Sequence, residues 1–496
     1  MRVVQPLQPQ LGDYSIADIQ FDLRSRDDIP QILRGLQYIY VNTELRNAMF
    51  KLLETHIQPN IDQNNGRPGM DLWKILVMGV LRLDLNWDYD RLHEQVNNHK
   101  TIRQMLGHAD IFDTYYYHHQ TLRDNVCLLT PLLLEEINEL VVSSGHALVK
   151  KKENEVLRGR CDSFVVKTNV HYPTDINLLF DAMRKVIALT ARLCEAHDHS
   201  EWRQYAYNVR HLKRLMRAAQ MKKRGGGKTE EQKAKRQEQM VVAHQQYMDI
   251  AQHYLDKARL SLKRLQELEV LTTNQTLTMF EAQQYMDNAA RQIDQTTRRV
   301  VEGKTIPHGE KVFSIFEPHT EWIVKGKAGV PMELGLKVCI MEDQHQFLLH
   351  HQVMEKQTDD QVALSMVSET IAHFPSLATC SFDKGFHSPE NQAALAEMLD
   401  VVALSRKGKR SKKIQEIESS EDFTQAKQKH SAVESAINGL GVHGLDRCPD
   451  HGLYGFKRYV ALSIVARNLQ RIGVILSSQE KKRLERAQKR KLKKAA

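Results

Sequence analysis

Several features are scarce or missing in this sequence of 496 residues. It has no apolar run of about 18 residues, and no apolar segment precedes a cleavage site near Met1, so we expect neither a membrane span nor secretion. Its six cysteines (127, 161, 194, 339, 380 and 448) form no CxxC pair, which argues against a disulfide framework and against a cysteine zinc site. We therefore expect a cytoplasmic protein with reduced cysteines and no membrane partner.

Positive charge is present but unevenly spread. The formal net charge is +9 and the pI is near 9.0, which suits a polyanionic partner. From Glu480 to Lys494 there are nine Lys or Arg and two Glu, a local charge of +7, so the other residues carry only +2. A second basic run spans 406–413. Such runs are often solvated, but we expect the C-terminal one to add sequence-independent phosphate contacts.

One stretch, 159–170, has the β-branched content and length of a buried strand, yet it carries an acid, Asp162. A carboxylate buried there would be costly to desolvate unless it met a cation, hydrogen bonds or water. The neutral interpretation is a salt bridge or cap at a strand end. Two further acids favour another interpretation: Asp383 follows the expected strand 377–382, and Glu434 lies on an expected helix, 424–440, after the expected strand 401–404.

Two strand-borne aspartates and a helix-borne glutamate are the ligands that a two-metal phosphoryl-transfer site requires. Hard oxygen ligands must converge there on Mg²⁺ ions about 3.5–4 Å apart. We take Asp162, Asp383 and Glu434 as catalytic residues and metal ligands. For the third position Glu418, Glu421 and Asp422 remain alternatives.

These three stretches resemble the acidic triad of the DDE-class transposases of bacterial insertion sequences. The branch that is most similar carries His-Tyr-Pro-Thr-Asp after the first aspartate, here 171–175, and the stretches 314–323, 383–391 and 434–438 are also similar. The resemblance implies a ribonuclease-H-like catalytic core and two Mg²⁺ ions, for which Mn²⁺ can substitute. It also implies double-stranded DNA as partner, both as element terminal inverted repeats and as target, a homodimer or higher multimer on that DNA, and association with the nucleoid.

Basic side chains near the acids are candidates for DNA contacts. A sister branch has Tyr, Arg and Lys around its glutamate where this chain has Lys427, His430 and Gly441, so those roles cannot be transferred directly. The candidates are Lys384, His387, Arg406, Lys407, Lys427, His430, His443 and Arg447.

The periodicity predicts an α+β chain in five parts. Residues 1–150 form a helical DNA-binding domain for end recognition, and 151–176 hold the first strand of the ribonuclease-H-like α/β core. Heptad-like stripes predict an all-helical, coiled-coil-like insertion at 177–301, which we expect to serve assembly or end binding. The rest of the core spans 302–473, with a strand at 311–315 and a last helix, 456–472, that ends at Gly473. A basic tail, 474–496, follows.

The function that this pattern predicts is metal-dependent cleavage of DNA at element ends, followed by 3′-hydroxyl strand transfer into target DNA. Two alternatives remain. One is a non-catalytic DNA-binding protein derived from a transposase, and the other is a ribonuclease-H-like nuclease without strand transfer. Inverted repeats on both sides of the reading frame would favour a mobile element.

Overall fold

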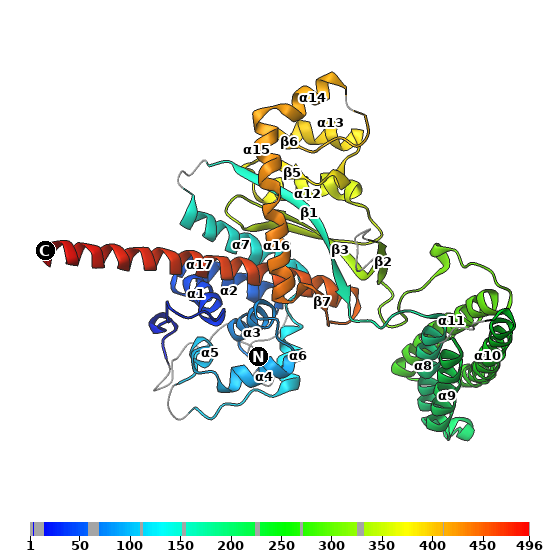
Figure 1. Ribbon diagram of the computed structural model, residues 1–496. Helices are drawn as coiled ribbons and strands as arrows, with labels where there is room; N and C mark the ends of the chain where they lie inside the picture. The colour runs from blue at the N-terminus through cyan, green and yellow to red at the C-terminus, as the bar shows by residue number, and fades with distance from the viewer. Residues whose placement is uncertain are drawn as a thin grey trace. The chain divides into compact units, whose positions relative to one another are not determined.

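The structure is a computed structural model with mixed α and β elements and a large share of helix. It describes residues 3, 14–57, 69–109, 113–150, 155–223, 229–267, 271–324, 332–409 and 411–495. The chain divides into two compact units (Figure 1). One contains residues 1–169 and 323–496 and is called the sheet unit here, and the other, 170–322, is called the helical unit.

The described residues form one seven-stranded mixed sheet around β1 (Leu157–Thr168). The other strands are β2 (Glu321–Val324), β3 (Met332–Glu342), β4 (Leu348–Met354), β5 (Leu377–Phe382), β6 (Val401–Ala403) and β7 (Arg447–Cys448). β1 pairs antiparallel with β3, which pairs antiparallel with β4. On its other side β1 pairs parallel with β5, which pairs parallel with β6, and its C-terminal end pairs parallel with β7.

Three sets of helices belong to the sheet unit. The N-terminal set is α1 (Ile29–Val41), α2 (Thr43–Ile57), α3 (Leu72–Asp84), α4 (Tyr89–Asn98), α5 (Lys100–Met105), α6 (His119–Val126) and α7 (Pro131–Val149). The set that alternates with the later strands is α12 (Asp359–His373), α13 (Pro389–Met398), α14 (Lys412–Ser419), α15 (Glu421–His430) and α16 (Ala432–Leu440). The last is α17 (Gly452–Ala495).

The N-terminal helices share one hydrophobic core with the sheet, so residue 150 does not separate two compact units. The reason is α17, which packs against α1, α3, α7 and β4. The expected helix end at Gly473 is wrong, because α17 continues through it. A Cβ at Gly473 would collide with the carbonyl oxygen of Gln31, and one at Gly35 with that of Leu469. These glycines therefore permit a close crossing of α1 and α17.

The same helix is the one element, among the described residues, that is long and apolar enough to cross a membrane. Its apolar window is 72% buried inside the protein, as expected of a core helix. Beyond Glu480 the basic segment expected as a tail continues α17, and residues 481–490 are exposed; the side chains of 491–494 lie outside the described residues.

The helical unit contains α8 (Asp175–Glu195), α9 (Tyr205–Lys223), α10 (Glu230–Gln266) and α11 (Thr273–Thr296). These helices bury their apolar stripes against one another in a core of their own. The strand expected at 311–315 is wrong: the segment has no strand, and Val312, Ile315 and Phe316 pack against the helical core instead. An apolar run of that length can fill a helical core as well as a sheet.

Candidate active site

Asp162 lies in the middle of β1, on one of two chemically different faces. Side chains alternate along a strand, so Cys161 and Ser163 point away from Asp162. The Ser163 hydroxyl donates to Asp359 Oδ1 at 2.7 Å, which places that face towards the start of α12. The opposite face holds Asp162 and lies towards α16, which packs on β1. Asp162 is half-buried, and its Oδ1 accepts from the Ser163 backbone N–H at 2.7 Å.

Strand register explains why the second acid approaches the first. Cys161 of β1 is paired with Phe382 of the parallel strand β5, so Asp162 and Asp383 are the next residues along both chains. Asp383 directly precedes a short 3₁₀ turn, Lys384–Phe386, and is exposed. The parallel pairing of β1 and β5 therefore places Asp162, within β1, beside Asp383, directly after the end of β5.

Glu434 is exposed in the first turn of α16. The single helix expected over 424–440 is wrong, because Ser431 separates α15 from α16. The break places Glu434 at a helix N-terminus, where the helix dipole favours negative charge.

The charges of these acids influence one another. The pKa of Asp162 is raised to about 6, first by burial and then by the carboxylates of Asp383, Asp359 and Glu434, against a lowering hydrogen bond from the Ser163 backbone. Asp383 and Glu434 are thus near enough to Asp162 for their charges to affect its pKa. Among the alternatives, Glu418 accepts from the Arg406 backbone, Glu421 accepts from Gln425, and Asp422 lines the cavity that Arg160 and Ser381 also line.

Asp359, the first residue of α12, was not among the predicted site residues. Lys337 donates to both of its carboxylate oxygens at 3.1 Å, and Ser163 donates to one. Because Asp359 follows Thr358 in a capping box, its sequence context is that of an ordinary helix start. The signal that could have identified Asp359 is its place at the start of α12, the helix that follows β4.

The acid cluster suits a hard divalent cation by its chemistry, since all of its ligands are carboxylate oxygens. Among the described residues, however, no three His, Cys, Asp or Glu side chains lie close enough to form a preformed metal site. The pKa of Asp162 is raised mainly by burial, and the neighbouring carboxylates add to that shift.

Two of the predicted DNA contacts instead support the end of β5. Lys427 donates to the Phe382 carbonyl at 3.1 Å, and His430 Nδ1 lies 3.0 Å from the Ser381 hydroxyl. Burial, with Lys427 nearby, lowers the pKa of His430 to about 4. His430 is therefore uncharged at neutral pH. It can exchange a hydrogen bond with phosphate but supplies no positive charge.

Four other candidates surround the turn after Asp383. Lys384 is exposed, and Lys407 donates to the Gly385 carbonyl at 2.8 Å. His387 and Arg406 line a small cavity of about 200 Å³, and burial lowers the pKa of His387. These side chains form a basic rim around the turn. Arg410, in the same basic run, lies outside the described residues.

The last two candidates lie away from the acids. His443 Nδ1 hydrogen-bonds the backbone carbonyl of Asp84, at the end of α3, so this ring joins the sheet unit's C-terminal part to its N-terminal helices. Arg447 is exposed on β7 opposite Lys167, five residues beyond Asp162 on β1. The structure does not bring either one to the acid cluster.

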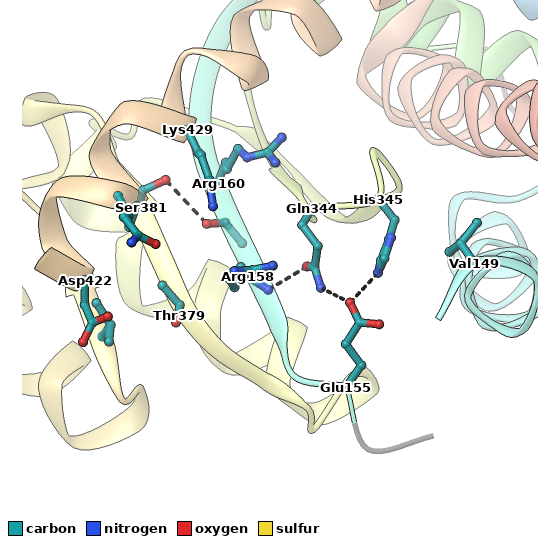
Figure 2. Close-up of a pocket in the computed structure, with 14 residues that line it drawn as sticks. Val149, Glu155, Arg158, Arg160, Gln344, His345, Thr379, Ser381, Asp422 and Lys429 are labelled. Atoms are coloured by element: carbon teal, nitrogen blue, oxygen red, sulfur yellow. Dashed lines mark hydrogen bonds and ion pairs between the residues drawn. The ribbon is translucent and has the colours of Figure 1, made fainter. Parts of the chain in front are cut away.

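A cavity of about 680 Å³ opens on the same face of the sheet (Figure 2). Arg158 and Arg160 of β1 and Thr379 and Ser381 of β5 line it, two and four residues before the aspartates on each strand. Lys429 of α15 faces it from above, and Arg160 is held by Glu342 at 2.8 Å. The cavity therefore continues the polar face that holds Asp162.

Comparisons of the chain with protein-family models, with curated proteins and with solved structures give no match. The site must therefore be interpreted from its own geometry.

Proposed function

We propose that this chain is a DDE transposase that cleaves DNA strands at element ends and transfers the freed 3′-hydroxyl to target DNA. The observation that carries the proposal is the placement of three acids on separate elements: Asp162 on β1, Asp383 directly after the parallel strand β5, and Glu434 in the first turn of α16. Burial raises the pKa of Asp162, and the carboxylates of Asp383 and Glu434 raise it further. A cluster of carboxylates that repel one another is costly unless cations or protons compensate it. Such perturbed groups gather at functional sites.

The strand order supports a ribonuclease-H-like core. Three antiparallel strands, β1, β3 and β4, are followed by α12 and then by β5 and β6 parallel to β1. The first acid then lies on the central strand, the second at the end of its parallel neighbour, and the third on the helix that covers them. The helical unit is inserted between β1 and β3 in the sequence.

The proposed mechanism assigns each group a task. Bound Mg²⁺ ions would supply activation of the attacking oxygen and stabilisation of the leaving oxygen. The three carboxylates would hold these ions, and Asp162, with a pKa of about 6, loses its proton readily near neutral pH. Lys427 and His430 fix the end of β5, so that Asp383 is positioned beside Asp162. Lys384, Lys407 and Arg406 face the DNA as a charged rim, with duplex DNA as the partner of a homodimer or higher multimer.

The test is cleavage of labelled DNA from the flanks of the reading frame, with Mg²⁺, with Mn²⁺ and with neither. Asp162→Ala, Asp383→Ala and Glu434→Ala should each lower cleavage by orders of magnitude while DNA binding persists. The matched control is Glu390→Ala, which removes an exposed carboxylate from the first turn of α13.

Full activity of the Glu434 variant would transfer the third ligand to another acid, with Asp359 tested first. Binding by the wild-type protein without cleavage in either metal would favour the non-catalytic descendant. Cleavage without strand transfer would favour a nuclease.

A further inference from the structure

The helix α9 differs in charge from the other helices of the helical unit. Between Tyr205 and Lys223 it contains six Lys or Arg and no acid, a net charge of +6. The balance is three basic against three acidic residues in α8, seven against five in α10, and one against three in α11. The positive charge of this unit is therefore concentrated on one helix.

The shape of α9 directs much of this charge to one side. Leu212, Met216 and Ala219 are buried in the core of the helical unit. At 100° per residue, Arg210, Arg214 and Arg217 lie on the opposite side, and all three are exposed. Two exposed side chains share that face, Tyr207 (52% exposed) and Met221 (73% exposed). We call Arg210, Arg214 and Arg217 the arginine stripe.

Three other cations of the helical unit are neutralised within it. Lys233 pairs with Glu230 at 2.6 Å, Arg259 pairs with Asp256 at 3.1 Å, and Arg264 pairs with Glu201. Within the described part of the chain, the arginine stripe forms no ion pair of this kind. Three guanidinium groups on one face without carboxylates repel one another, and an external polyanion removes that cost.

We propose that the arginine stripe binds the phosphate backbone of duplex DNA, independently of sequence. From Arg210 to Arg217 the helix advances about 10 Å, at 1.5 Å per residue, and a DNA duplex carries one charge per about 1.7 Å of its axis. Three guanidinium groups can thus reach neighbouring phosphates together. Arginine suits phosphate because it donates two parallel hydrogen bonds, and the Tyr207 hydroxyl can add a backbone contact.

This site goes beyond the proposed function, because α9 belongs to the helical unit and contains none of the catalytic acids. It assigns that unit a share of non-specific DNA affinity. An acidic protein surface is the competing partner, but it lacks the regular, dense charge of a duplex.

The experiment uses the full chain in EDTA, with a labelled duplex of arbitrary sequence, and measures affinity by fluorescence anisotropy across a salt series. The test variant is Arg210→Gln/Arg214→Gln/Arg217→Gln. The matched control, Lys233→Gln/Lys235→Gln/Arg259→Gln, removes three exposed positive charges from α10. Circular dichroism checks that both fold; if the triple variant does not, Arg214→Gln alone takes its place, with one third of the expected slope change.

We expect the test variant to lower the slope of log affinity against log salt by roughly 2.7, about 0.9 for each of three phosphate contacts, with an affinity loss on the order of a hundredfold at 0.1 M salt. The control should change the slope by less than about one contact. Equal losses of affinity in the test and control variants would show that only net charge matters and would overturn the site. An unchanged salt slope in the test variant would overturn it too. Loss of binding to poly-glutamate alone would also overturn it, in favour of an acidic protein partner.

Cleavage with Mg²⁺ is measured on the same preparations. A wild-type chain that binds DNA through α9 but never cleaves it would contradict the proposed function and leave this inference standing. Normal cleavage by the wild-type chain, with a salt slope that the test variant leaves unchanged, would support the proposed function and contradict this inference.

Discussion

The two faces of β1 are built from different chemistry. On one face Cys161 lies 3.4 Å from Cys339 of β3, sulfur to sulfur, and Cys380 of β5 lies 3.4 Å from the Met341 sulfur; all four side chains are fully buried. On the other face the same three strands carry arginine, serine, glutamate and aspartate beside a cavity. We call these the thiol face and the acid face.

The difference shows how one strand can serve both stability and chemistry. Burial raises the pKa of the Cys161, Cys339 and Cys380 thiols, so they stay neutral and pack as small apolar groups. That close packing fixes the strand from behind, while the acid face stays open enough for Asp162 to be half-buried. A site mounted on a rigid strand keeps its geometry better than one mounted on a loop.

The largest effect should come from breaking the acid face as a unit. Asp162→Ala and Asp383→Ala should each reduce cleavage on the order of a thousandfold or more, and the double variant should be little worse than either. The reason is that both residues serve the same ions. Single-turnover cleavage of a labelled DNA end measures all three proteins, and losses that multiply in the double variant would show two independent roles.

A carboxylate moved to the thiol face should cost stability instead of activity. Cys339→Asp would bury a charge without a partner, and we expect a loss of about 3–5 kcal/mol in the free energy of unfolding. Thr379→Asp is the matched control, because it adds the same group beside the cavity on the acid face and should cost less than about 1 kcal/mol. Urea denaturation compares them, and equal losses would contradict the distinction between the faces.

A smaller effect concerns the charge of Asp162 in metal-free protein. Its pKa is about 6 in the folded state, against an ordinary value of 3.8, so between those pH values the folded protein keeps a proton that the unfolded chain has lost. Stability therefore falls as pH rises through this window. Asp162→Asn removes the penalty and should raise the free energy of unfolding by about 1–2 kcal/mol at pH 7.5 in EDTA, after allowance for solvent screening.

At pH 3.5 the aspartate is protonated in the folded state and mostly protonated in the unfolded chain, so the advantage of Asp162→Asn should largely vanish. Thermal unfolding at pH 3.5 and at pH 7.5 measures both values. An Asn variant that is less stable than wild type at pH 7.5 would show that the carboxylate is already compensated by the protein.

Much of the acid face was predictable from the sequence because its parts are local. The strand 377–382 was predicted with the limits that the structure has, and the acid that follows it is at the strand end by sequence alone. The contact between Asp359 and Ser163 of β1 was not predictable, because it depends on where α12 begins relative to the sheet. The tasks of Lys427 and His430 were missed for the same reason, because their partners are backbone and hydroxyl groups of β5 that the sequence does not place.

Larger arrangements depended on packing that has no local signal. Gly473 carries the same letter whether it ends a helix or lets two helices cross, and the collision that a Cβ would make with α1 decides between these. The apolar residues at 311–315 likewise fit a sheet or a helical core, and the stripes of α8 and α11 provide the latter.

The most direct test of the account is divalent-ion binding to the acid face. Isothermal titration of metal-free full-length protein with Mn²⁺ should detect ions whose binding is weakened at least about tenfold by Asp162→Asn, Asp383→Asn or Glu434→Gln, because each removes a charged ligand. Glu390→Gln, at the start of α13, should bind as wild type does. Equal Mn²⁺ binding by wild type and all three variants would contradict the claim that these acids form one metal site.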